Sequence, residues 1–147
     1  MADTETFQKI LQIRERDKNQ AKKSYQQSVQ SSEHIASQLY SLLKNKEEAE
    51  VKYHQQLHAK SSVTTLSNFH QYLQKIKAKV RNLEMSVNKA RQEMNQKQSQ
   101  LTEAHIEVKK IEKMLEQKKS LAIQKEKYEE NKFLDEITVT QFLNNKR

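Results

Sequence analysis

The chain has 147 residues and a formal net charge of +8, and it contains no Gly, Pro, Cys or Trp. Hydrophobic residues make up 34% of it and charged residues 31%, which is too little apolar material for a thick globular core. The absence of Gly and Pro excludes most compact folds, because tight turns, phosphate-binding loops and many helix caps use these residues. Without Cys there are no disulfides and no thiol chemistry. We therefore expect an all-α protein that is long rather than round.

The first predicted helix covers about residues 5–59. Steps of four and three from Phe7 to Gln56 visit fifteen positions, of which nine are apolar. Such a spacing marks an imperfect heptad seam, the stripe of core positions along which one coiled-coil helix packs against another.

The second predicted helix covers about residues 64–134 and has the stronger seam, with fourteen apolar residues among fifteen positions from Leu66 to Leu115. The two seams are out of phase by one residue, about 100° of helix rotation, so one unbroken helix could not turn both toward the same partner. The mismatch falls at residues 61–68, whose Ser and β-branched residues are poor helix formers. We predict a turn at about 60–63, with the Ser62 hydroxyl accepting a hydrogen bond from the Thr65 amide as an N-cap.

These features predict a long two-helix antiparallel coiled-coil hairpin that forms a single elongated domain over residues 1–147. With the turn centred near residue 62, Phe7 lies opposite about residue 117, and the seam of the second helix weakens there. The second helix is therefore expected to overhang the first as far as Leu134. Asp135–Thr138 interrupts the pattern, so residues 135–147 are expected to form a short tail. The hairpin buries its own seam, which predicts a monomer.

Candidate catalytic and metal-binding residues are few. His54 and His58 are four residues apart in HQQLH, which lacks the Glu that follows the first His of zinc metalloproteases, and no third ligand is evident. Paired acids such as Glu47 and Glu48 lie on exposed helix, with no cleft for acid–base catalysis. We expect no enzymatic activity, metal, cofactor or small-molecule substrate. We also expect a cytosolic protein, because the chain lacks an apolar run of about 18 residues and its N-terminus soon becomes charged.

Basic residues crowd the second helix between Lys75 and Arg91, where six basic residues face one acidic residue. A charge run on a coiled coil is usually a solvated face, and its functional alternative is a surface for an acidic partner. Nucleic acid is less favoured, because Lys outnumbers Arg by 22 to 5 and no aromatic platform accompanies the stretch. A basic coiled-coil adaptor that binds nucleic acid or the ribosome remains the alternative function.

Local strings along the whole chain resemble the flagellar FliJ proteins of bacterial type III export, and in part their Bacillus-like members. The strings are FQKILQIRERDKNQAKKSYQQSV near the N-terminus, NFHQYLQKI after the turn, MNQKQSQLTEAHIEVKKIEKM in the second helix and LDEITVTQF at its end. This resemblance implies an antiparallel coiled coil similar to the central stalk subunit of rotary ATPases, in agreement with the hairpin predicted from the seams.

The resemblance also implies a function. It implies a component of the flagellar protein export apparatus that couples the hexameric export ATPase ring to the cytoplasmic domain of the export-gate membrane protein, with export chaperones as further partners. Such a protein would serve flagellum assembly, and hence motility and chemotaxis, from the cytoplasmic side of the membrane at the flagellar base. The positions that match the gate-contact strip of the family are Gln38, Leu42, Tyr72, Ile76 and Leu83.

The termini are expected to face the ATPase ring, as the resemblance implies. The overhang carries apolar residues such as Leu121, Tyr128 and Phe133 without a partner helix, and its lysines suit a ring interior that offers carboxylates. The residues that we assign to this contact are Phe7, Lys9, Arg14, Lys118, Lys119, Lys125 and Lys127.

Overall fold

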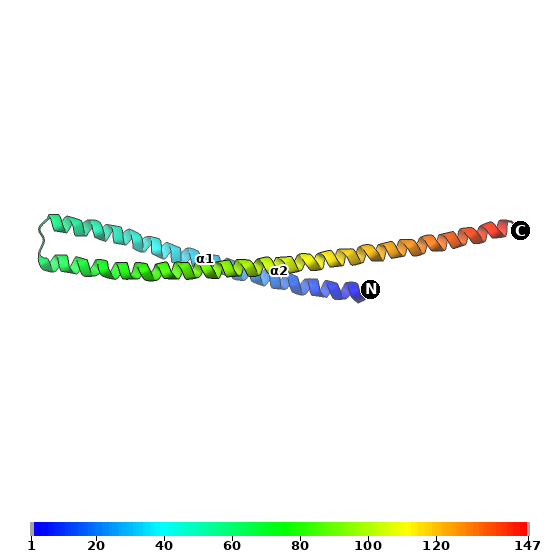
Figure 1. The fold of residues 1–147 in the computed structure, drawn as a ribbon, viewed down its shortest axis with the longest axis horizontal. Helices are drawn as coiled ribbons and strands as arrows, with labels where there is room; N and C mark the ends of the chain where they lie inside the picture. Colours follow the sequence, from blue (N-terminus) through cyan, green and yellow to red (C-terminus); the bar gives the residue numbers. More distant parts are fainter. Residues whose placement is uncertain (1, 147) are drawn as a thin grey trace. The chain divides into compact units, whose positions relative to one another are not determined.

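The protein is described here by a computed structural model in which residues 2–146 are placed. Two long helices, α1 (Ala2–His58) and α2 (Val63–Asn145), account for nearly all of them, and these residues include no strand (Figure 1). The predicted all-α helical hairpin is confirmed. The chain divides into two compact units, one of Gln20–Thr102 and one of Met1–Asn19 with Glu103–Arg147. We call them the turn unit and the terminal unit.

The turn unit contains the connection between the helices, which the sequence predicted to within a residue or two. Lys60 adopts a left-handed backbone conformation with φ of 54°, and the Ser61 amide donates to the Gln56 carbonyl at 3.3 Å. This is the Schellman arrangement that usually uses Gly, formed here by a lysine. The Thr65 amide donates to the Ser62 hydroxyl at 3.2 Å, so the predicted N-cap of α2 is confirmed.

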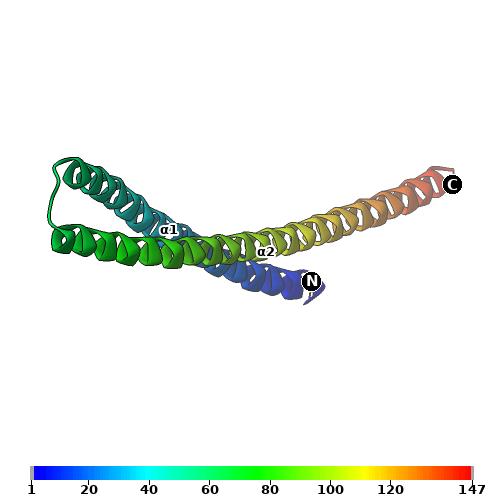
Figure 2. The same cartoon turned by 60° about the vertical axis from the view of Figure 1, so that its left-hand side comes forward.

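The core of the turn unit lies between the two helices, which run antiparallel from the turn (Figures 1 and 2). Ala49 from α1 packs against Leu73, Ile76 and Val80 from α2, and all four side chains are at least nine-tenths buried. The small Ala49 side chain lets the larger α2 residues fit beneath α1. Leu39, Leu42 and Tyr53 extend this core along α1.

Both predicted seams are correct. All fifteen positions of the α2 seam are buried or half-buried, and so are fourteen of the fifteen positions of the α1 seam, with Arg14 as the exposed exception. The heptad pattern therefore identified the packed face of each helix from the sequence.

In the terminal unit, the first turns of α1 pack against α2 at the predicted position. The Lys118 ammonium group lies 4.3 Å from the centre of the Phe7 ring, where pairing opposite about residue 117 was expected. Val108 and Leu115 supply the buried apolar side chains of α2 in this unit. Beyond Ala122, every described residue of α2 is exposed, so the predicted overhang is present.

The end of α2 differs from the prediction. The helix does not stop at Leu134 but continues to Asn145, through the residues 135–138 that were expected to interrupt it. The Thr138 and Thr140 hydroxyls each donate to the carbonyl four residues earlier, at 2.8 Å. These bonds satisfy the hydroxyls within the helix, and with no Pro or Gly in the segment nothing forces the helix to end. The expected tail of residues 135–147 is thus helical over nearly all of its length.

Candidate functional site

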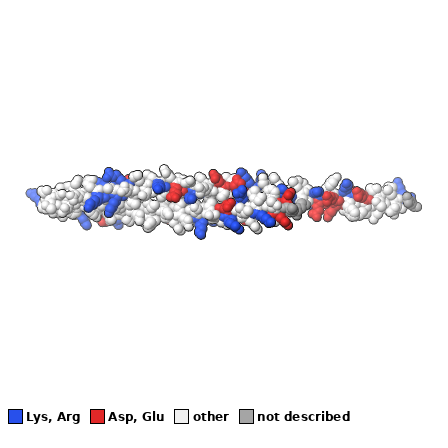
Figure 3. Space-filling view, turned by 90° about the horizontal axis from the view of Figure 1, so that it is seen from below, with Lys and Arg blue, Asp and Glu red and all other residues white. Residues whose placement is uncertain are grey.

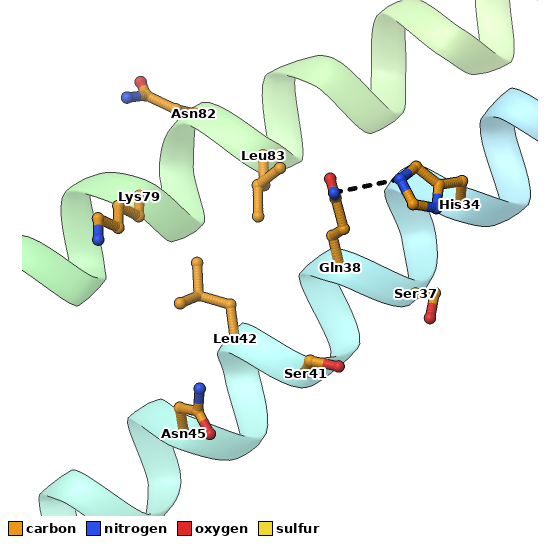
Figure 4. A pocket seen from close by; sticks show the side chains of 9 residues that line it. All are labelled: His34, Ser37, Gln38, Ser41, Leu42, Asn45, Lys79, Asn82 and Leu83. Carbon is orange, nitrogen blue, oxygen red and sulfur yellow. Dashed lines mark hydrogen bonds between the residues drawn. The ribbon is translucent and has the colours of Figure 1, made fainter.

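A groove of about 560 Å³ runs between α1 and α2 in the turn unit (Figure 4). Its walls are mostly small polar side chains, and its floor is aliphatic. The lining residues are His34, Ser37, Gln38, Ser41, Leu42 and Asn45 from α1 with Lys79, Asn82 and Leu83 from α2.

The groove exists because of how side-chain size alternates along α1. Leu42 and Leu83 point toward one another across the space between the helices and form the floor (Figure 4). Ser37 and Ser41, one helical turn apart, are too short to cover that floor. Gln38 lies at the edge and forms a hydrogen bond with His34 at 3.3 Å. The result is an apolar floor bordered by hydrogen-bonding groups, a combination suited to a protein segment with one apolar anchor.

The electrostatic character of the groove is basic. Lys79 is the one Lys, Arg, Asp or Glu residue of its lining. Lys and Arg side chains also gather on α2 close to the turn, in the predicted basic stretch (Figure 3). A partner that fills the groove would therefore meet positive charge and little negative charge.

Three of the five predicted gate-contact residues come together in this groove, namely Gln38, Leu42 and Leu83. Tyr72 is 53% exposed and lines two smaller hollows nearer the turn, eleven residues before Leu83. Ile76 is only 4% exposed and belongs to the core, so its side chain is not on the surface. The seam position of Ile76 accounts for this, because a heptad core residue faces the partner helix.

The predicted ATPase-contact residues lie in the terminal unit, and two of them contact each other. Lys118 covers the Phe7 ring and forms an ion pair with Asp3 at 3.6 Å. We refer to Asp3, Phe7 and Lys118 as the clasp, because they join the first turns of α1 to α2. The Lys118 side chain is thus engaged within the chain rather than free on the overhang.

The other predicted ATPase-contact residues are exposed, and they are Lys9, Arg14, Lys119, Lys125 and Lys127. Arg14 forms an ion pair with Asp17 at 3.7 Å. Lys125 borders a second hollow of about 300 Å³, located where α1 begins. The floor of this hollow is Leu121 and Ala122, and its remaining walls are Asp3, Thr4 and Lys118.

The sequence interpretation missed both the clasp and the polar walls of the groove. The signal for the clasp was the opposite charge of Asp3 and Lys118, which the predicted hairpin places across from one another on its two helices. Ser37 and Ser41, small residues beside the seam, were the signal for the groove. His54 and His58 are exposed, and the described residues contain no group of three His, Cys, Asp or Glu side chains able to hold a metal ion.

Comparison with known proteins identifies the family. The family model for the flagellar FliJ protein matches residues 4–147, which is nearly the whole chain. The chain belongs to the FliJ family. It is 36% identical over 137 residues to the flagellar FliJ protein of Bacillus subtilis (strain 168), and the match covers 93% of each chain. No solved structure matches the chain.

Membership in the FliJ family makes this a flagellar protein and supports a role connected with flagellar export. Over the described residues, neither helix has a stretch apolar enough to cross a membrane. Two surface features of the described residues stand out, the groove of the turn unit and the exposed end of α2.

Proposed function

We propose that this chain couples the flagellar export ATPase ring to the cytoplasmic domain of the export-gate membrane protein. In this proposal it acts without catalysis of its own, at the cytoplasmic side of the membrane at the flagellar base, and it supports flagellum assembly, motility and chemotaxis. Export chaperones are further partners. The chain offers two separate docking surfaces, one for each principal partner.

The gate is proposed to bind at the groove of the turn unit. Gln38, Leu42 and Leu83 lie together there, and the surrounding serines leave the aliphatic floor accessible. A segment with an apolar anchor and acidic neighbours would fit the groove, since Lys79 and the basic stretch of α2 supply the complementary charge. Tyr72 extends the contact toward the turn, while Ile76 supports the groove from the core.

The ATPase ring is proposed to hold the exposed end of α2. At about 100° per residue, Leu121, Tyr128 and Phe142 lie on one side of this helix and Ile123, Leu134 and Ile137 on the opposite side. Two apolar stripes on opposite sides suit an enclosing partner better than a flat one. The lysines at 119, 125 and 127 lie among these residues, and exposed lysines form weak contacts that can reform as ring subunits change state.

One observation carries this proposal: α2 continues as an exposed helix from Ile123 to Asn145, rich in large apolar residues. A lone amphipathic helix draws most of its stability from packing, so a helix this long and this apolar requires a covering partner. In this proposal the export ATPase ring is that partner, because a ring can enclose a single helix.

The gate contact is tested by filling the groove. Ser41→Trp places a large ring over the Leu42–Leu83 floor, and Ser31→Trp makes the same change at an exposed position of α1 outside the groove. With purified gate domain, calorimetry should show at least a roughly tenfold weaker affinity for Ser41→Trp and unchanged affinity for Ser31→Trp. Equal affinities for the two variants would refute the groove as the docking surface.

The ATPase contact is tested on the overhang. Tyr128→Asp places a charge in one apolar stripe without disturbing the buried seam, and it should weaken binding to the purified ATPase while leaving gate binding unchanged. A deletion strain complemented with the variant should lose motility. If a deletion strain exports filament subunits normally, the coupling function is wrong, and salt-sensitive RNA binding would then favour the nucleic-acid adaptor.

A further inference from the structure

We propose that two copies of this chain associate through antiparallel pairing of the exposed α2 ends, over residues 121–142. This inference concerns the free protein and does not rest on the proposed partners. Leu121, Tyr128, Val139 and Phe142 are 57–69% exposed, and they lie on the same side of the helix. These four residues belong to a heptad stripe of their own, in which core positions follow one another at steps of four and three residues. The other core positions of the stripe are Lys125, Lys132 and Asp135.

This stripe is complementary to itself when it is reversed. Antiparallel coiled coils pair the two kinds of heptad core position across the interface, and pairing centred on Glu130 creates three matched layers in each half. Leu121 meets the second copy's Val139, an aliphatic pair. Lys125 meets the second copy's Asp135, an ion pair. Tyr128 meets the second copy's Lys132, a cation–π pair.

The parallel alternative is disfavoured by the same residues. A parallel pair in register would bring Lys125 against Lys125, Lys132 against Lys132 and Asp135 against Asp135. Each of these layers places like charges together within a contact from which water is largely excluded, and such contacts are strongly unfavourable. The charge sequence therefore selects the antiparallel arrangement.

The hollow at the start of α1 provides the second observation. Its floor, Leu121 and Ala122, is apolar, and Lys118 and Lys125 stand at its edge. Antiparallel pairing brings the second copy's Val139 and Phe142 to this hollow and its Asp135 to Lys125. An apolar and acidic segment thus meets an apolar and basic recess, and the two-fold symmetry repeats the contact on the other copy.

The association should be weak, because charged residues occupy three of the seven stripe positions and the contact is shorter than a standard interface. We expect a dissociation constant of roughly tens of micromolar, so that dilute protein is the predicted monomer. The dimer would cover the overhang, and an enclosing partner would have to displace the second copy.

The test is a charge exchange followed by sedimentation equilibrium of the purified full-length protein. Asp135→Lys and Lys125→Asp should each weaken dimerisation by roughly tenfold or more, because each creates two like-charge contacts. The double variant, with the charges exchanged, should restore it. Glu130→Lys is the matched control: it makes the same charge change as Asp135→Lys on the opposite side of the helix and should leave dimerisation unchanged.

Spin labels test the direction of the pairing, and the chain has no native Cys to interfere. Labels at Glu130→Cys lie level with the two-fold axis on the outer sides of the two helices, so the distance between copies there is set only by the width of the helix pair. Labels at Gln141→Cys lie eleven residues further along the helix in each copy, in opposite directions. At 1.5 Å per residue, this separates the two labels by about 33 Å along the helix axis. The proposal would be overturned if the native protein stayed monomeric up to about 500 µM, or if the two labelled positions gave equal distances. It would also be overturned if the single variants dimerised as strongly as the native chain, or if the double variant did not recover dimerisation.

Discussion

Replacing Ile76 by Ala should destabilise the turn unit far more than the same replacement at Ile123. Ile76 is 4% exposed and packs with Ala49, Leu73 and Val80, whereas Ile123 is 53% exposed on the overhang. The substitution removes three carbon atoms, which at about 0.8 kcal/mol each gives about 2.4 kcal/mol for a fully buried side chain. The cavity left behind adds to this loss, and the better helix propensity of Ala returns about 0.4 kcal/mol.

We therefore expect Ile76→Ala to lower the free energy of unfolding by about 2–3 kcal/mol. Ile123→Ala should change it by less than about 0.5 kcal/mol, since more than half of Ile123 is exposed and the better helix propensity of Ala offsets part of the loss. Urea denaturation followed by circular dichroism at 222 nm, at a protein concentration where the chain is monomeric, measures both. Equal losses for the two variants, or a loss below about 1 kcal/mol for Ile76→Ala, would refute the assignment of the core. A large loss of stability for Ile76→Ala would also mean that any weaker gate binding by this variant results from a destabilised turn unit and not from a lost direct contact.

Three further predictions concern the turn and the clasp. Lys60→Gly should stabilise the protein by about 1 kcal/mol, because Gly adopts the left-handed conformation without the cost that a side chain adds, and thermal unfolding measures it. Ser62→Ala should destabilise it by about 1 kcal/mol through loss of the N-cap of α2, in the same assay. Lys118→Gln should speed hydrogen exchange in residues 3–10 severalfold, by removing the contacts with Phe7 and Asp3, whereas Lys119→Gln should not. Unchanged exchange in Lys118→Gln would mean that the clasp does not hold α1.

Most of the fold was predictable because a coiled coil repeats one simple rule. The seam residues from Leu66 to Leu115 identified the buried face, and the phase change between the seams located the turn. The end of α2 was not predictable in this way. Residues 135–138 lack an apolar pattern, and their helix is maintained by backbone and threonine hydrogen bonds that depend on local geometry. Lys60 was missed for a similar reason, because nothing in its side chain signals a left-handed conformation.

The candidate site was less predictable than the fold. The strip carried over from the family resemblance contained Gln38, Leu42 and Leu83, which the register of the hairpin does bring together. The groove itself forms because the side chains of Ser37 and Ser41 are too short to cover the Leu42–Leu83 floor. These small residues beside the seam are a weak signal, because the sequence does not show whether other side chains cover the floor. The clasp was missed because Lys118 was treated as part of a free overhang. Lys118 in fact lies on α2 beside the first turn of α1, where it pairs with Asp3.

Hydrogen exchange of the full-length chain can show whether the two proposed docking surfaces serve different partners. The exchange would be measured alone, with saturating export ATPase and with saturating gate domain, at a protein concentration below self-association. We expect the ATPase to slow exchange in residues 121–145 and to leave exchange in the groove residues 34–45 and 79–83 unchanged. We expect the gate domain to do the reverse. Protection of the groove by the ATPase with unchanged exchange in residues 121–145 would contradict the proposal.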